Sequence, residues 1–324
     1  MLLRLPFLLP FILILIIPSA HAAEAGFQRG RTAAGAEIGI WYPAEGLPVR
    51  QRFGLYTADV VPDATVPHGR HPLVVISHGT GGDYASHVDT AVALARAGFV
   101  VAALTHPGDN WRDNSRAIRI EERPPAVRAL VTHMLTIWTG RAAIDPRRIG
   151  AFGFSSGGFT VLAAVGGRPN LTRMASHCAA NPTYFDCTLM TAQPRASVLP
   201  RWPDMRDRRI RAVVLAAPAL GFVFDRPGLA DVRVPVQLWR ADDDRILPAP
   251  HYADSVRRAL PVSPEFQSVP GAGHFDFLAP CSDPPAMPVI CASAPGFDRA
   301  AFHVRFNVEV VRFLTAKLGS SRRR

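Results

Sequence analysis

The sequence has very little lysine and only a modest number of acidic residues. Lys317 is its only lysine, and the other basic side chains are arginines scattered along the chain, with a formal net charge of +10. A nucleic-acid-binding protein gathers its basic side chains into one patch or stripe. The densest basic stretches, residues 206–211 and 322–324, are short and typical of a solvated loop and a terminal tail. We therefore expect neither nucleic acid nor an anionic membrane as a partner.

The sequence also lacks an apolar run long enough to cross a bilayer as a helix. The longest run, residues 5–17, has 13 residues and is interrupted by two prolines, whereas a span needs about 20. Arg4 precedes this run and Ala20-His21-Ala22 follows it, which is the order of a secretory signal with its cleavage site. We expect residues 1–22 to be a signal peptide cleaved after Ala22, an uncleaved anchor being the alternative. The mature protein is then periplasmic or secreted.

Cysteine is scarce, with four residues in the whole chain. They form two close pairs, Cys178 with Cys187 and Cys281 with Cys291. No CxxC pair or tight Cys/His cluster is present, so a zinc site is not favoured. Disulfides persist in the oxidising compartments to which exported proteins go. We expect two local bridges, although four cysteines allow three pairings.

Low-complexity linkers and internal repeats are absent from the sequence. Apolar residues make up 48% of the 324 residues and charged residues 19%, a composition typical of a globular protein. Because no change in composition divides the chain, we expect one domain over residues 23–324. One stretch, residues 166–209, is rich in Pro, Asn, Arg and Ser and is too long for a plain loop in a compact domain. We interpret it as a lid or rim insertion.

Short β-rich runs alternate with helix-length segments along the rest of the chain. The sequences LVVIS and FVVAAL are continuous apolar runs, as in strands that are buried on both faces. Such alternation is typical of a mostly parallel sheet covered by helices, so we predict an α/β fold with a doubly wound sheet. The predicted strands are 37–42, 73–77, 99–104, 148–154, 211–217, 234–240 and 266–269, and the predicted helices are 84–97, 124–139, one starting after 155, 250–260 and 299–318.

Ser155 lies at the centre of a G-x-S-x-G pattern, Gly153-Phe154-Ser155-Ser156-Gly157. The pattern falls between a predicted strand and a predicted helix, the context in which it presents a nucleophile on a sharp turn. Glycine on either side leaves room in a crowded backbone, and the helix N-terminus favours negative charge that develops there. A Gly-rich turn without a catalytic role is the alternative. We predict Ser155 as a nucleophile because further motifs accompany it.

The run His78-Gly79-Thr80-Gly81-Gly82 follows the predicted strand 73–77. A loop in this place supplies one backbone NH of an oxyanion hole, and the residue after the nucleophile supplies the other. We therefore predict the NH groups of Thr80 and Ser156 as the oxyanion hole. His78 precedes the nucleophile in the chain, so we interpret it as structural rather than as a general base.

Three consecutive aspartates, Asp242, Asp243 and Asp244, follow the predicted strand 234–240. Ligands of such sheets bind at the carboxyl ends of the strands, so an acid that orients a catalytic base belongs here. Asp244 stands four residues before Pro248, and this arrangement resembles the acid loop of many α/β-hydrolases. We therefore predict Asp244 as the acid and its two neighbours as solvated side chains.

The loop Gly271-Ala272-Gly273-His274 follows the last predicted strand. A flexible loop of small residues lets an imidazole reach both a serine and a carboxylate. The chain order Ser155, Asp244, His274 is the order found with a nucleophile on a strand-to-helix turn. We therefore predict His274 as the general base. His251, the nearest alternative, falls in the predicted helix 250–260.

Two other features flank the predicted site. The loop between Cys281 and Cys291 begins seven residues after His274, so a bridge there pins the segment that carries the base. The first cysteine pair then braces the insertion. Residues 106–110 (HPGDN) follow the predicted strand 99–104 and are typical of a turn with local Asp and Asn hydrogen bonds, the alternative being a pocket lining.

The chain resembles bacterial proteins described as dienelactone hydrolase-like, within a wider α/β-hydrolase group that includes platelet-activating-factor acetylhydrolases. The likeness covers nearly all of the mature chain. It rests on PLVVISHGTGG, AGFVVAALTHPGDN, IGAFGFSSGG, VPVQLWRADDDRILP and GAGHFDFL. The resemblance implies the α/β-hydrolase fold and the same roles for Ser155, Asp244 and His274.

Two departures separate the chain from the named groups. Dienelactone hydrolases have a cysteine nucleophile where this chain has Ser155, and animal platelet-activating-factor acetylhydrolases take the acid from an earlier strand end, here residues 216–219 (AAPA). We therefore predict hydrolysis of a small or medium carboxylic ester, without a metal or organic cofactor. The alternatives are an amidase or peptidase with the same triad and a noncatalytic binding protein with the same fold.

Overall fold

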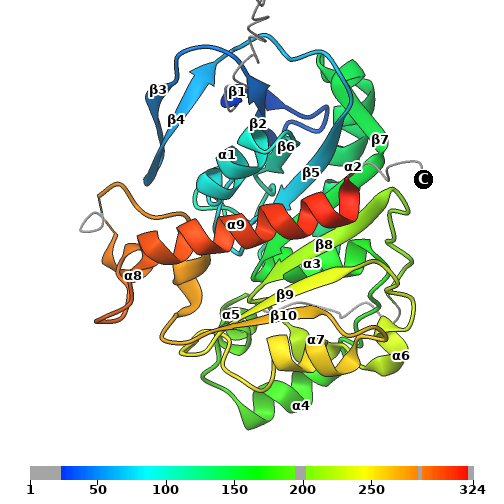
Figure 1. The fold of residues 1–324 in the computed structure, drawn as a ribbon. Helices are drawn as coiled ribbons and strands as arrows, with labels where there is room; N and C mark the ends of the chain where they lie inside the picture. Colours follow the sequence, from blue (N-terminus) through cyan, green and yellow to red (C-terminus); the bar gives the residue numbers. More distant parts are fainter. Residues whose placement is uncertain (1–22, 194–201, 284–286, 320–324) are drawn as a thin grey trace, which may run out of the picture.

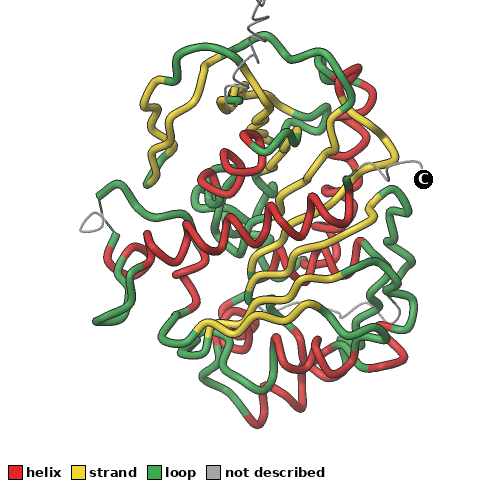
Figure 2. Tube along the Cα trace, viewed as in Figure 1, coloured by secondary structure: helices red, strands yellow, loops and turns green. Residues whose placement is uncertain are grey.

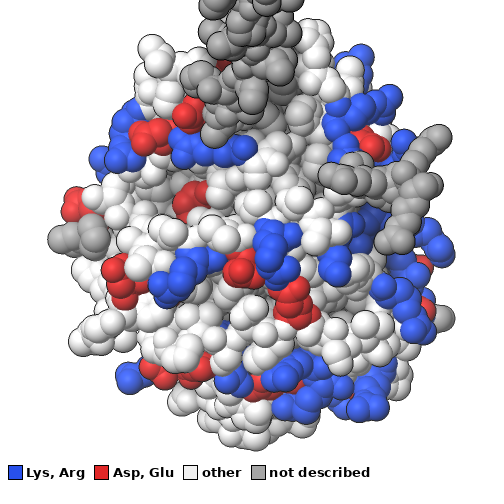
Figure 3. Space-filling view, viewed as in Figure 1, with Lys and Arg blue, Asp and Glu red and all other residues white. Residues whose placement is uncertain are grey.

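The computed structural model describes residues 23–193, 202–283 and 287–319. The predicted signal peptide, residues 1–22, and the arginine tail, residues 322–324, lie outside the described residues. None of the helices in the described part of the chain combines the length and the apolarity that a membrane span needs. On the face drawn in Figure 3, basic and acidic side chains are interspersed.

The described residues form one ten-stranded sheet, which runs through the centre of the molecule (Figure 1). The strands are β1 (Glu24–Arg31), β2 (Glu37–Ala44), β3 (Val49–Phe53), β4 (Tyr56–Pro62), β5 (His71–Ser77), β6 (Val100–Leu104), β7 (Ile144–Phe154), β8 (Ile210–Ala216), β9 (Val236–Ala241) and β10 (Glu265–Val269). Their order across the sheet is β10-β9-β8-β7-β5-β6-β2-β1-β4-β3. The six strands from β10 to β6 are parallel, so their carboxyl ends meet along one edge.

The remaining four strands form a mixed extension of the sheet. Strand β2 is antiparallel to both β6 and β1, and β4 is parallel to β1 and antiparallel to β3. The mostly parallel α/β sheet predicted from the sequence is confirmed. Strands β1, β3 and β4 were not predicted, because their sequences are half polar and contain no continuous apolar run.

Helices lie on both sides of the sheet (Figure 2). Helices α1 and α9 pack against one face, and α2, α3 and α7 pack against the other. The helices are α1 (Val88–Arg96), α2 (Arg123–Thr136), α3 (Ser156–Ala164), α4 (Arg173–Ala180), α5 (Phe185–Ala192), α6 (Arg226–Leu229), α7 (Ala253–Ala259), α8 (Pro288–Cys291) and α9 (Arg299–Leu318). Side chains therefore fill two core layers, one on each face of the sheet.

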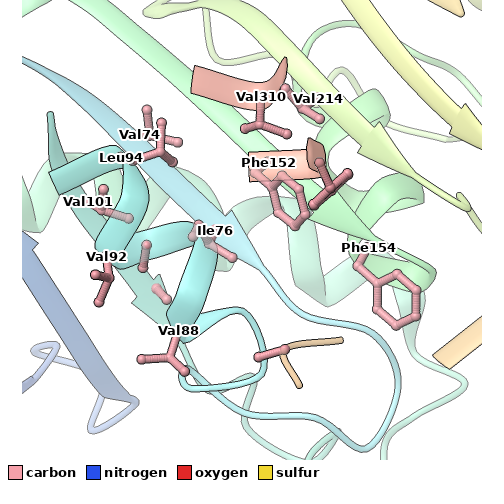
Figure 4. Close-up of a cluster of buried hydrophobic side chains, with 14 of the residues drawn as sticks. Val74, Ile76, Val88, Val92, Leu94, Val101, Phe152, Phe154, Val214 and Val310 are labelled. Atoms are coloured by element: carbon pink, nitrogen blue, oxygen red, sulfur yellow. The ribbon is translucent and has the colours of Figure 1, made fainter. Parts of the chain in front are cut away.

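The central strands divide their side chains between these two layers by simple alternation. Val74 and Ile76 of β5 face the α1 and α9 side, where Figure 4 shows them near Phe152 of β7. Leu73 and Val75 face the opposite layer. Burial of both faces stabilises these strands by about 2 kcal/mol for each large side chain. It also fixes where each strand ends and so where the following loop emerges.

Two predicted helices start later than the sequence pattern indicated. Helix α1 begins at Val88 instead of residue 84, because Asp83 and Thr105 accept hydrogen bonds from the NH groups of Ala85 and Tyr84 and hold a turn there. Helix α7 begins at Ala253, since two prolines precede it and the residue before a proline avoids helical backbone angles. His251, which we expected within this helix, lies in the loop before it.

The predicted insertion, residues 166–209, carries two helices, α4 and α5. A disulfide between Cys178 and Cys187 joins them. Tyr252, in the loop before α7, donates a hydrogen bond to Asp186 of α5 at 3.0 Å, which ties the insertion to the main sheet. We refer to residues 166–193 as the lid.

Candidate active site

Ser155 occupies a strained turn between β7 and α3. Its φ of 54° and ψ of −122° place it in a region that residues with a side chain rarely adopt. A Cβ atom at Gly153 would lie 2.1 Å from the carbonyl oxygen of Gly157, and one at Gly157 would lie 1.9 Å from that of Ser77. Only glycine fits at either position. The G-x-S-x-G pattern is therefore a steric requirement of this turn.

Ser155, His274 and Asp244 form a chain of hydrogen bonds at the carboxyl edge of the sheet. The Nε2 atom of His274 lies 3.0 Å from Oγ of Ser155, and its Nδ1 atom lies 2.7 Å from Oδ2 of Asp244. All three side chains are buried. The residues follow the carboxyl ends of β7, β9 and β10; β9 and β10 are neighbours in the sheet, and β8 lies between β9 and β7.

The carboxyl group of Asp244 is held in the ionised form. Burial alone raises its pKa, but the neighbouring His274 and the NH groups of Leu247 and Ile246 outweigh the burial, so that the pKa lies below its ordinary value. These NH groups donate to Oδ1 at 2.7 and 2.9 Å. An ionised carboxylate only accepts hydrogen bonds, so Nδ1 of His274 carries the proton and Nε2 can accept one from Ser155.

The other candidates for acid and base lie elsewhere. Asp242 and Asp243 are exposed, and Asp242 instead accepts hydrogen bonds from Arg240 and Ser268. His251 contacts the rings of His177 and Tyr184 in the lid region. The structure thus brings Asp244, and neither neighbouring aspartate, to the imidazole of His274.

His78 lies beneath the loop that follows β5. Its Nδ1 donates to the carbonyl oxygen of Gly79 at 2.6 Å, and its Nε2 accepts from the NH of His106 at 3.0 Å. Burial and the nearby Arg123 lower the pKa of His78 well below its usual range, which agrees with a neutral ring that accepts at Nε2. With both nitrogens used in this way, His78 holds the loop in place.

Thr80 and Ser156, whose NH groups we predict as the oxyanion hole, are in contact through their side chains. Their hydroxyl oxygens lie 2.8 Å apart in a hydrogen bond. Both residues line the cavity that Ser155 also lines. Ser156 opens α3, so its NH is one of the first-turn donors that have no partner within the helix.

A buried ion pair that sequence reasoning missed supports the Thr80 loop. Arg123 donates to Oδ2 of Asp109 at 2.5 Å, to Oγ1 of Thr160 at 3.0 Å and to the carbonyl oxygen of His78. The other carboxyl oxygen of Asp109 accepts from the NH of Gly81 at 3.0 Å. Asp109 belongs to the HPGDN turn, and its side chain therefore fixes the loop rather than lining the lid-side cavity. We call Arg123, Asp109 and Thr160 the closed cluster.

A second buried ion pair supports the loop that carries His274. Oδ2 of Asp276 accepts from the NH of Gly273 at 2.8 Å, and Oδ1 accepts from Nε of Arg299 at 3.0 Å. Arg299 also donates to the carbonyl oxygen of Ile290 at 2.9 Å, next to Cys291. The disulfide between Cys281 and Cys291 is present, as the sequence predicted. The loop that carries His274 and this disulfide loop are therefore both held by Arg299.

A small apolar cavity of about 90 Å³ extends from Ser155 beneath the lid. We call it the lid cavity. Its walls come from the lid, from the segment before α2 and from loops at the carboxyl edge. The lid residues that line it are Leu171, Met174, Phe185, Asp186, Leu189 and Met190.

A larger cavity of about 380 Å³ lies on the other side of the Thr80 loop. We call it the aromatic cavity, because Tyr56, Tyr84, Trp111 and Phe275 line it. His274 does not line it, but the rings of two lining residues, Phe275 and Phe154, have centres 5.5 and 4.8 Å from that of His274. Thr80 lines both cavities and forms the wall between them.

Among the described residues, one group of three side chains has the atom types and spacing of a metal site. It consists of His177, Asp186 and Cys187, whose ligand atoms lie within 4.8 Å of one another. The sulfur of Cys187 is bonded to Cys178 and so supplies no thiolate. This group therefore lacks the free ligands that a metal site needs.

No model of a known protein family matches the chain. The chain is similar to "Putative esterase NocK" from Nocardia uniformis subsp. tsuyamanensis, with 30% identity over 135 residues. This stretch is 39% of the chain and 38% of that relative, so less than two-fifths of the relative's length is matched.

Over almost its whole length the chain is also similar to a solved structure, the ferulic acid esterase from Streptomyces cinnamoneus. The TM-score is 0.59 and the sequence identity is 20%, with 92% of this chain and 91% of that chain covered. Likeness at this level of identity concerns the fold. Together with the parallel sheet and the strand-to-helix turn at Ser155, it shows that the chain has the α/β-hydrolase fold.

Proposed function

We propose that the protein is a serine esterase that hydrolyses small carboxylic esters. The observation that carries the proposal is the hydrogen-bonded chain from Ser155 through His274 to Asp244, with distances of 3.0 and 2.7 Å. These are the distances that nucleophilic catalysis by a serine and a histidine requires. Ser155 is the nucleophile, His274 is the general base, and Asp244 orients the imidazole.

The reaction proceeds through an acyl-enzyme. Oγ of Ser155 attacks the ester carbonyl carbon while Nε2 of His274 takes the hydroxyl proton. The bond from carbon to the alkoxy oxygen then breaks, and His274 returns the proton to the departing alcohol. Water then attacks the acyl carbon while His274 takes its proton. The bond from the acyl carbon to Oγ breaks, His274 returns the proton to Oγ, and the carboxylic acid leaves. The NH groups of Thr80 and Ser156 stabilise the negative oxygen of both tetrahedral intermediates.

The two cavities take the two halves of the ester. The departing alcohol receives its proton from His274, so it lies on the side of that imidazole, where Phe275 and the aromatic cavity are. The acyl group then faces the lid cavity. A volume of about 90 Å³ is smaller than the 150 Å³ cavity that holds benzene, which favours a short acyl chain.

The names of the similar proteins support an ester as the substrate. One is called a putative esterase and the other a ferulic acid esterase. The resemblance to dienelactone hydrolase-like and platelet-activating-factor acetylhydrolase-like proteins is part of the same proposal. In each case the substrate is a small molecule.

The protein is exported in this proposal. Two disulfides, Cys178–Cys187 and Cys281–Cys291, support an oxidising compartment, where such bonds persist. Signal cleavage after Ala22 is tested by the N-terminal sequence and intact mass of the protein recovered from culture medium or periplasm.

Covalent labelling tests the proposed nucleophile. A fluorophosphonate reacts with an activated serine, so the wild type should be labelled once and Ser155→Ala should not be labelled. The same substitution should lower kcat on p-nitrophenyl acetate by about 10⁵-fold or more. Ser156→Ala is the matched control, because it keeps its backbone NH and should still be labelled. Equal labelling of wild type and Ser155→Ala would overturn the assignment.

A chain-length series tests the small acyl site. Rates on p-nitrophenyl acetate, butyrate, hexanoate and octanoate should fall steeply beyond butyrate. Rates that stay level to octanoate would contradict a short acyl chain in the lid cavity. Hydrolysis of the matching anilides at similar rates would instead make the protein an amidase.

A further inference from the structure

The lid cavity is lined mostly by apolar side chains and by three hydroxyl-bearing residues, and one of its lining residues is ionisable. Asp186, on α5, is the only ionisable residue among the described residues that line this cavity. Its neighbours there include Met174, Leu189 and Leu247. Asp186 is 7% exposed, so its carboxyl group has little contact with bulk water. A carboxyl group in such a place is costly unless its oxygens are hydrogen-bonded.

The carboxyl group uses only one of its two oxygens. Oδ1 accepts from the hydroxyl of Tyr252 at 3.0 Å and from the NH of Cys187 at 3.1 Å. Oδ2 is buried and has no hydrogen-bond partner among the described residues. Buried polar atoms in folded proteins nearly always have a partner, and Asp186 lines the lid cavity. The unpartnered oxygen therefore points to a ligand group that enters from this cavity. Less than 1 Å² of Oδ2 is exposed, so the ligand reaches it as neighbouring side chains of the wall move aside.

The surroundings keep the carboxyl group from turning toward solvent. The disulfide at Cys187 restrains the residue that directly follows Asp186. Tyr252, in the loop before α7, donates its hydrogen bond to Oδ1. His177 of α4 stacks on Phe222 with ring centres 3.6 Å apart and an angle of 9° between the planes. Its Nε2 lies 3.4 Å from the hydroxyl of Tyr252. Asp186 is therefore preorganised, as a specificity group must be.

We propose that Asp186 selects esters whose acyl group carries a hydroxyl, which binds to Oδ2 in the lid cavity. The proposal rests on the esterase function and on the acyl group facing the lid. It makes Asp186 a specificity-determining residue and the substrate a short hydroxyacyl ester. The alcohol half of the substrate plays no part in it.

A hydroxyl is the group that suits Asp186 in both of its protonation states. Burial raises the pKa of Asp186, although Tyr252 and the NH of Cys187 act in the opposite direction. A hydroxyl donates to an ionised carboxylate and accepts from a protonated one. An ammonium group binds only the ionised form and brings a second charge into an apolar cavity, which costs more.

Paired esters test the proposal with the full-length mature protein. The probes are methyl butanoate against each enantiomer of methyl 3-hydroxybutanoate, with acid release followed by titration. The wild type should prefer at least one hydroxy ester over its unsubstituted partner by about tenfold in kcat/KM. This is the discrimination that one hydrogen bond to a charged group supplies.

Asp186→Leu should remove this preference and retain hydrolysis of methyl butanoate. Asp186→Asn, which keeps the shape and a hydrogen-bonding group, should retain part of it. Thr188→Leu, a substitution at an exposed position on the same helix, is the matched control and should behave as wild type.

Two outcomes would overturn the role of Asp186. One is a wild type that hydrolyses unsubstituted and hydroxy esters at equal rates, and the other is an Asp186→Leu variant that keeps the preference. A wild type that hydrolyses no ester at all would instead overturn the esterase function itself. If the leucine variant fails to fold, equal rates of the wild type on the hydroxy and unsubstituted esters would still overturn the proposal.

Discussion

Two buried acidic side chains flank the proposed nucleophile, and their surroundings differ. In the closed cluster, both oxygens of Asp109 have partners, and Arg123 is bonded through Nε and both terminal nitrogens. Asp186 of the lid has Tyr252 and the NH of Cys187 on one oxygen and no partner among the described residues on the other. We call Asp186, Tyr252 and His177 the open cluster.

The difference separates two uses of a buried carboxylate. A fully bonded ion pair fixes the backbone around it, and the closed cluster holds both the carbonyl of His78 and the NH of Gly81 in the Thr80 loop. An incompletely bonded carboxylate contributes less to stability and has bonding capacity left for a ligand. In our proposal, stability is thus assigned to the loop that carries Thr80 and specificity to the lid cavity.

The largest expected effect comes from breaking the closed cluster. Arg123→Met leaves the carboxylate of Asp109 buried without a countercharge, and we expect the free energy of unfolding to fall by about 3 to 5 kcal/mol. Urea unfolding followed by circular dichroism measures this. Arg128→Met, at an exposed position on the same helix, is the control and should change stability by about 0.5 kcal/mol or less. A loss below about 1 kcal/mol in Arg123→Met would show that the ion pair does not brace the fold.

The same variant has a kinetic signature if it still folds. Arg123 acts through the Thr80 loop and touches no substrate, so it is a positioning residue. Displacing one oxyanion donor should lower kcat by about 100-fold and leave KM nearly unchanged. A rise in KM with unchanged kcat would instead mean that Arg123 serves substrate binding.

The two disulfides should differ in kinetics more than in stability. Each closes a short loop, with sequence separations of 9 and 10, and its removal should cost about 2 to 3 kcal/mol. Cys281→Ser with Cys291→Ser loosens the loop beside His274 and should lower kcat. Cys178→Ser with Cys187→Ser loosens the lid and should raise KM. Identical changes of kcat and KM in the two double variants would show that the lid and the loop that carries His274 do not have separate kinetic roles.

The smallest expected effect comes from neutralising the open cluster. The pKa of Asp186 is raised above 3.8 in the folded protein by burial, so the folded state favours the neutral carboxyl. Ionising Asp186 therefore lowers the free energy of unfolding. This loss begins as the pH rises above the pKa of the unfolded chain and is complete above the pKa of the folded protein. Asp186→Asn should therefore match the wild type in Tm at low pH and exceed it by about 2 °C at pH 8, a difference of about 1 kcal/mol.

Removing the charge of Asp186 would then stabilise the folded protein, whereas removing the charge of Arg123 in the closed cluster destabilises it. Thermal unfolding of both proteins across the pH range measures it. A Tm of Asp186→Asn below that of the wild type at pH 8 would mean that the carboxylate of Asp186 is satisfied in the folded protein.

Much of the framework was predictable because it depends on residues close together in sequence. Strand β5 and the second half of β7 are mostly apolar runs, and both strands end at a motif whose glycines the backbone requires. Helix α9 agrees with the prediction at both ends, since Asp298 caps it and Gly319 follows it. Of the three adjacent aspartates, Asp244 was distinguished by its distance from Pro248.

The supporting contacts were not predictable in the same way, because each joins residues that only the fold brings together. Arg123 lies 14 residues from Asp109, Arg299 lies 23 residues from Asp276, and Tyr252 lies 66 residues from Asp186. Arginines are common throughout this chain, so the sequence did not distinguish the buried Arg123 and Arg299 from the exposed arginines. One signal was available: Asp109 belongs to a turn already noted, and its side chain proved to bond beyond that turn.

In the esterase that we propose, the position of Thr80 in the lining of both cavities affects how substrate preference can be changed. A larger or smaller residue there alters the room for the acyl group and for the alcohol in one step, so laboratory evolution at this site trades one preference against the other. Substitutions at Asp186 or at Trp111 each reach one cavity alone. Libraries that vary these two positions and leave Thr80 fixed therefore allow the two selectivities to be tuned separately.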